Sequence, residues 1–293
     1  MQITNFLLLA GALGAVAHPS GHAHLHRSAE AKREVFVKNI HREPIPKPSP
    51  PPPKPKPTST TSAAPEPTLP SLGDLINEFI PFCGGGAASR KSKRVTDAQV
   101  MYTGNLGTDG GCPWNSNIMA VAESLLGKYQ YTQTYTNVAD VPYQVVCGNK
   151  MGADRQLTGM FKVPGQKQLI FTLAPGESKV VVVDANTQGI CAFAPNEVPL
   201  TKDGQYAGNW VEYDAGSDAN KGWSGADCSS LVAQAYKMDV PGCKVSHGGI
   251  DSIILPGGKG TNAYTIGMEK LDGIGLNIIP GPWHLEVSVG FSG

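Results

Sequence analysis

Twelve of the 24 prolines of this 293-residue chain lie between Pro44 and Pro70, and this segment divides the sequence. A stretch so rich in proline, interleaved with serine, threonine and lysine, cannot bury a core and favours extended polyproline II. We therefore expect a disordered Pro-rich N-terminal region followed by one folded domain. The sequence divides into residues 1–17, 18–43, 44–70, 71–94 and 95–293.

The first of these segments, Met1–Ala17, has the pattern of a secretory signal peptide. Phe6–Val16 is an apolar run of suitable length, and Ala15-Val16-Ala17 fits the small-residue cleavage rule. The run is too short to cross about 30 Å of hydrocarbon. We expect a secreted protein, extracellular or in the cell wall, that does not insert in a membrane. Residues 18–43 are charged and His-rich, as in a propeptide.

Residues 71–94 hold a short helical pattern and a basic run. Leu72–Ile80 shows helical spacing of apolar residues after Ser71, a suitable N-cap. Arg90–Arg94 is basic and ends in a dibasic pair. Two interpretations stay open for this run: a solvated tether, or a processing site that frees Val95–Gly293.

Residues 95–293 have the composition of a β domain. They carry 12 Lys+Arg against 18 Asp+Glu, a formal charge of −6, which argues against a nucleic-acid partner. Their 28 glycines separate short strand-like runs, as turn residues do. These runs are Tyr143–Cys147, Gln168–Leu173, Lys179–Val183, Cys191–Phe193, Trp210–Asp214 and His284–Val289.

The fold class that this pattern predicts is a β-sandwich with one or two short helices. Pro175-Gly176 is expected to join two strands as a hairpin turn, and Val180–Val183 to be buried on both faces. Asn117–Tyr129 is the best helix candidate, and Asp227–Met238 fits either a second helix or an extended segment.

Catalytic motifs are absent from the sequence. It contains no GxSxG elbow, HExxH helix, P-loop or dinucleotide fingerprint, so no cofactor and no metal are expected. The domain has two histidines, His247 and His284, each expected to have a surface or packing role.

The strand Trp210–Asp214 carries the most suggestive acids. Alternation places Trp210, Glu212 and Asp214 on one face, with Trp223 and Asp227 following in sequence. Three interpretations are open: a carboxylate pair for glycoside hydrolysis, a patch that contacts sugar without cleaving it, or a solvated acidic strand. An alternative packing would turn Trp210 inward and Tyr213 outward.

An ordered set of short motifs resembles the Asp f 4-like family of secreted fungal allergens. The set comprises Tyr102–Asn105, Gly111–Pro113, Asn115–Ile118, Asn149–Gly152, Leu173–Glu177, Asp184–Gly189, Trp210–Asp214, Gly222–Asp227, Asn262–Tyr264 and Leu271–Gly275. The resemblance covers Val95–Gly293 and implies a secreted or wall-associated protein with no established catalytic residues. A weaker likeness links Trp210–Asp214 and Asp227–Ser229 to the acidic strands of thaumatin-like proteins.

Six cysteines agree with an oxidising compartment, although sequence alone does not choose among their pairings. Cys147 and Cys191 stand where members of the resembled family carry bulky residues, so we hypothesise that they pair across strands. Cys228–Cys243 and Cys83–Cys112 are then the remaining bridges.

The function expected from the sequence is that of a non-catalytic protein of the cell wall or exterior. Its candidate partner is glucan or chitin, contacted by Trp210, Glu212, Asp214 and Trp223. The alternative is a glycoside hydrolase or other carbohydrate-active enzyme that uses paired carboxylates from among Glu212, Asp214 and Asp227.

Overall fold

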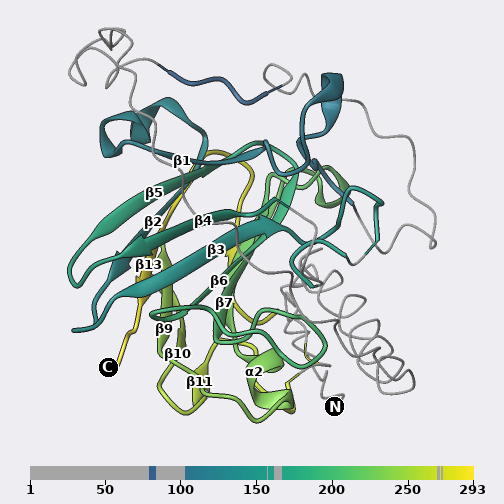
Figure 1. Ribbon diagram of the computed structural model, residues 1–293. Coiled ribbons are helices and arrows are strands. Elements are labelled where there is room, and N and C mark those ends of the chain that lie inside the picture. The colour runs from purple at the N-terminus through teal and green to yellow at the C-terminus, as the bar shows by residue number, and fades with distance from the viewer. Residues whose placement is uncertain (1–78, 84–102, 157, 162–166, 269–270, 272) are drawn as a thin grey trace, which may run out of the picture.

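The computed structural model describes residues 79–83, 103–156, 158–161, 167–268, 271 and 273–293 (Figure 1). The expected signal peptide, His-rich segment, Pro-rich linker and basic run lie outside these residues. So does the helix expected at Leu72–Ile80, except for its last two residues. Phe79 and Ile80 are described and are not helical.

The first of two sheets, sheet A, has seven strands in the order β1-β5-β2-β13-β9-β10-β11. The pair β2–β13 is parallel and the other pairs are antiparallel. Its strands are β1 (Ile118–Val121), β2 (Tyr131–Asn137), β5 (Ser178–Val183), β9 (Cys243–His247), β10 (Ile250–Ile254), β11 (Gly260–Thr261) and β13 (Trp283–Val289).

Sheet B has six antiparallel strands in the order β12-β8-β7-β6-β3-β4. They are β3 (Tyr143–Asn149), β4 (Leu169–Leu173), β6 (Thr187–Pro195), β7 (Asn209–Ala215), β8 (Ser224–Ser229) and β12 (Leu276–Ile278). The described helices are short: the 3₁₀ turns η2 (Asp109–Gly111), η3 (Glu123–Lys128) and η4 (Asp218–Asn220), and α2 (Leu231–Ala235). The predicted two-sheet β architecture with few short helices is confirmed.

An inner core lies between the two sheets. Alternate residues of both sheets point into it, as the two-residue period of a strand requires. The largest side chains of this inner core include Tyr135, Phe193, Tyr213 and Leu285. All four valines of Val180–Val183 are buried, which confirms that prediction.

Two local predictions are wrong. The helix expected at Asn117–Tyr129 is instead β1 followed by η3, because Ile118–Val121 pairs with the valines of β5. Pro175-Gly176 does form a turn, with Glu177 N donating to Ala174 O at 2.9 Å, but the turn joins no hairpin. It carries the chain from β4 in sheet B to β5 in sheet A.

The region Asp227–Met238 divides into the end of β8 and the single turn α2.

Three disulfides join Cys83–Cys112, Cys147–Cys191 and Cys228–Cys243, the pairs that we hypothesised. Cys147 and Cys191 face each other on β3 and β6, with their Cα atoms 4.0 Å apart. The Cys228–Cys243 bridge connects β8 of sheet B to β9 of sheet A.

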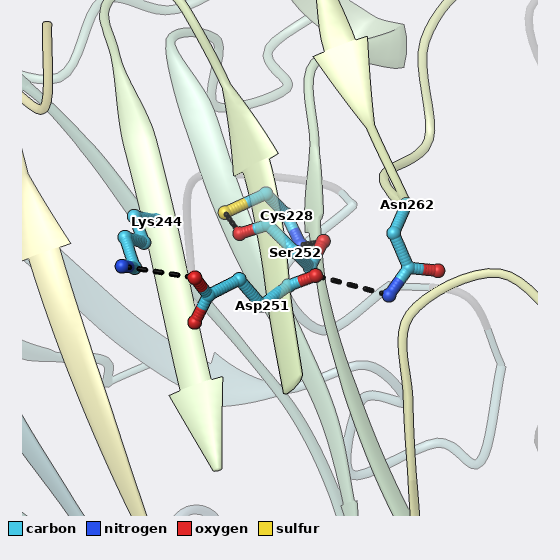
Figure 2. Close-up of polar contacts among 5 residues, drawn as sticks. All are labelled: Cys228, Lys244, Asp251, Ser252 and Asn262. Atoms are coloured by element: carbon cyan, nitrogen blue, oxygen red, sulfur yellow. Dashed lines mark hydrogen bonds and ion pairs between the residues drawn. The ribbon is translucent and has the colours of Figure 1, made fainter. Parts of the chain in front are cut away.

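A corner of the sandwich is closed by polar contacts around this inter-sheet bridge (Figure 2). Ser252 Oγ of β10 accepts a hydrogen bond from Cys228 N of β8 at 2.9 Å, which adds a second link between the sheets. Asn262 Nδ2 donates to Asp251 O at 3.0 Å, and Lys244 forms an ion pair with the Asp251 carboxylate at 3.0 Å. The Asn262 bond holds the residue that follows β11 against β10.

Candidate functional site: the acidic outer face of sheet B

Strand β7 separates two environments, as its alternation predicts. Val211, Tyr213 and Ala215 belong to the inner core. Trp210 belongs to a second apolar cluster, on the opposite face of sheet B. The predicted shared face of Trp210, Glu212 and Asp214 is therefore correct, and the alternative that turns Tyr213 outward is wrong. We call this surface the outer face of sheet B.

Three carboxyl side chains gather on the outer face. Glu212 lies directly opposite Asp227 in the β7–β8 register, and Asp214 is two residues further along β7. Directly opposed residues of antiparallel strands have Cα atoms about 4.5–5.5 Å apart. All three acids are buried, with Glu212 and Asp227 at 0% exposure. The interpretation of these acids as a solvated strand is therefore wrong.

Lys150 is a member of this cluster that the sequence analysis missed. It follows β3, its backbone N donates to Gln188 O of β6 at 3.0 Å, and its Nζ lies 2.9 Å from Glu212 Oε2. A lysine directly after the buried run Val145–Asn149 was a usable signal, because lysine is rarely buried unless it is paired.

A cover over part of the outer face explains the burial of Trp210. Phe161 packs on Trp210 with ring centroids 5.5 Å apart, and Trp210 is 2% exposed. The second apolar cluster combines residues of β3, β6 and β7 with two loops and α2: Val146, Met160, Phe161, Ile190, Ala192, Ala194, Val198, Tyr206, Trp210 and Val232. The indole of Trp210 therefore supports this cover and offers no open ring to a sugar.

Trp223 occupies a different position on the same sheet. Extending the β8–β12 register by one residue places it opposite Ile279, because Ser224 pairs with Ile278. Trp223 is half-buried, Asn277 is exposed and Ile279 is 68% exposed. The outer face is thus covered around Trp210 and the acids and opens to solvent towards Trp223.

Gly275 allows the backbone directly before β12 to lie close to Asp227. Gly275 has φ +97°, and a Cβ on it would lie 2.7 Å from Ala226 O and 2.8 Å from Asp227 Cβ. The loop before β12 can therefore lie against Asp227 only with glycine at this position.

The two histidines lie at one end of sheet A, away from the acids. Thr132 Oγ1 and His284 Nδ1 are 2.9 Å apart, and His247 Nδ1 is 2.8 Å from the His284 carbonyl oxygen. Desolvation is the main reason that the pKa of His284 is lowered from its ordinary value; nearby Glu286 opposes this shift and His247 adds to it. Both histidines have the packing contacts expected of them.

Neither a metal site nor a membrane span is found among the described residues. Within these ranges, no group of three or more histidine, cysteine, aspartate or glutamate side chains could hold a metal ion. No helix in the described part of the chain is long and apolar enough to span a membrane.

Two packed β sheets, three disulfides and a covered acidic cluster define a disulfide-bonded β-sandwich protein. Comparison with known families gives a closer assignment, because the model of the allergen Asp f 4-like domain matches residues 116–289. The chain belongs to the Asp f 4-like allergen family.

Individual relatives were also found. The chain is 35% identical over 214 residues to Allergen Asp f 4 of Aspergillus fumigatus, which covers 72% of this chain. This chain spans 64% of the length of Allergen Asp f 4. Among solved structures, the protein elicitor MoHrip2 from Magnaporthe oryzae gives a TM-score of 0.33 at 13% identity, covering 55% of this chain and 99% of its own. The thaumatin-like xylanase inhibitor TLXI gives 0.32 at 12% identity, covering 54% and 97%.

Proposed function

We propose that this chain is a secreted protein, extracellular or associated with the cell wall, that contacts wall polysaccharide without cleaving it. Secretion is supported by the pairing of all six cysteines, since disulfides persist in oxidising compartments. The signal-peptide pattern of Met1–Ala17 supports the same route.

The observation that carries the binding proposal is the opening of the outer face at Trp223. This indole is partly exposed beside exposed Ile279, and exposed Asn277 adds an amide for hydrogen bonds with hydroxyl groups. Aromatic rings with one apolar side and one wet side suit stacking on the apolar faces of sugars. The burial of Trp210, Glu212 and Asp214 leaves Trp223 as the contact residue among the four candidates.

The test of this proposal is retention of the purified full chain on insoluble glucan and on chitin. We expect Trp223→Ala to lower retention, because it removes the stacking ring. The matched control is Ile170→Ser on β4, which alters a side chain 54% exposed at the opposite edge of sheet B. Unchanged retention by folded Trp223→Ala on both polymers would refute the proposal.

The alternative is a glycoside hydrolase that uses Glu212, Asp214 or Asp227. The direct opposition of Glu212 and Asp227 favours it, because paired carboxyl groups carry out this chemistry. Their burial opposes it, since a polymer must first displace the groups that cover them. Reducing ends released from glucan or chitin by the unmodified chain, and lost in Glu212→Gln, would establish the hydrolase.

A further inference from the structure

The outer face of sheet B brings a lysine amine and a carboxyl group into contact in a place that is shielded from water. Lys150 Nζ lies 2.9 Å from Glu212 Oε2, with the two side chains 8% and 0% exposed. The carboxyl carbon of Glu212 is one bond beyond that oxygen. The two groups that could condense to an amide are therefore neighbours.

The burial of this contact bears on the step. A buried ion pair gains little after desolvation, because both charges must leave water. Transfer of one proton from Lys150 Nζ to the Glu212 carboxylate across the 2.9 Å contact gives a pair without charges. A neutral amine beside a neutral carboxyl group is the reactive combination for amide formation.

We propose that Lys150 and Glu212 join in an intramolecular amide bond. The lone pair of the neutral Lys150 Nζ attacks Glu212 Cδ, and the new C–N bond replaces the bond from Cδ to one carboxyl oxygen. Nζ gives up one proton, and the departing hydroxyl group takes one, so that a single water molecule leaves. No atom changes oxidation state, and no co-reactant is consumed.

Asp227 is placed to relay the proton in this step. It lies directly opposite Glu212 across β7–β8 and is also fully buried. In its carboxylate form it accepts the proton released by Nζ and passes it to the leaving hydroxyl group. This is general acid–base catalysis by a neighbouring side chain.

The sheet supplies the driving force that amide formation lacks in open water. Lys150 is fixed at the end of β3 by its bond to Gln188 O of β6, and Glu212 is fixed on β7, which pairs with β6. Well-oriented intramolecular groups reach effective molarities of about 10⁵ M or more. Burial also denies water to the finished bond. The amide would connect β3 to β7 across β6.

The test is a tryptic map of the full-length protein after its disulfides have been reduced and alkylated. Without the amide, trypsin cuts after Lys150 and releases Asp203–Lys221 as a separate peptide. With the amide, Tyr129–Arg155 stays intact and is joined to Asp203–Lys221, with a total mass lower by one water molecule. Fragmentation of the joined species assigns the bond to Glu212 or to Asp214.

The controls are Lys150→Arg, which keeps the charge but cannot form this amide, and Asp227→Asn, which removes the relay. We expect no joined peptide in Lys150→Arg and a reduced joined fraction in Asp227→Asn. Complete recovery of the two peptides as separate, full-mass species from the unmodified protein would overturn the proposal. A bond located at Asp214 would overturn the assignment to Glu212.

Discussion

The two faces of sheet B are covered by different layers. The inner core covers one face; on the other face lies the outer layer, which consists of the second apolar cluster and the acidic cluster with Lys150. The two layers bury different kinds of side chain. The inner core joins two sheets through apolar and aromatic side chains such as Phe193 and Leu285. The outer layer joins one sheet to loops and to α2, and it combines Phe161 and Trp210 with buried charged groups.

The layer between the two sheets is largely apolar and includes uncharged polar groups such as Gln133 of sheet A. The face covered by loops holds a cluster of charged residues.

The largest expected effect tests whether the two layers differ in how far they can close the cavity that a truncated side chain leaves. Phe193→Ala in the inner core should lower the free energy of unfolding by about 5 kcal/mol, because β6 is held by strands on both sides and cannot close the cavity. Phe161→Ala in the outer layer should cost about 3 kcal/mol, because Phe161 lies outside the strands and no strand pairing keeps its backbone from moving towards Trp210. Denaturant unfolding measures both.

Equal losses from these two substitutions would contradict the comparison. They would show that the outer layer is as rigid as the inner core.

The next effect concerns the buried charge of the outer layer. Lys150→Met should lower the free energy of unfolding by about 3–5 kcal/mol, because Glu212 then stays buried without Lys150 Nζ, its partner in the ion pair and in the proposed amide. The double variant Lys150→Met/Glu212→Leu should recover the part of that loss that comes from the buried charge, since both charges are gone. Denaturant unfolding of the two variants, set against the unmodified chain, separates the cost of an unpaired charge from the contribution of the contact. A double variant as unstable as the single one would contradict this account.

The smallest effect is expected outside both layers, at His284 on sheet A. Its pKa is lowered in the folded state, so the unfolded chain takes up the proton first as the pH falls. The stabilising contribution of neutral His284 is thus present above its ordinary pKa of about 6.5 and is lost below it. His284→Gln should flatten the dependence of the melting temperature on pH between about 7 and 5, where this titration falls. A slope unchanged by the substitution would place the titrating group elsewhere.

The sequence predicted the face of Trp210, Glu212 and Asp214, because alternation along one strand is a local property. It did not predict what covers that face. Phe161 reaches Trp210 from a distant segment, and the cross-strand partners of Glu212 depend on sheet order and register. Likewise, the apolar spacing of Ile118, Val121 and Leu125 fits a helix, but pairing with β5 makes the first part a strand. Non-local pairing overrides local preference at these positions.

The disulfide between Cys83 and Cys112 changes the outcome of backbone cleavage between these two residues. Ile80 and Tyr129 exchange two hydrogen bonds, and Phe79 and Phe82 pack on the same tyrosine ring, so the residues before Cys83 are fastened to the β domain by more than the disulfide. A protease acting after Arg94 would therefore divide the protein into two polypeptides without separating them. The upstream arm would depart only after reduction, so the molecule would run as one species on a non-reducing gel and as two on a reducing one.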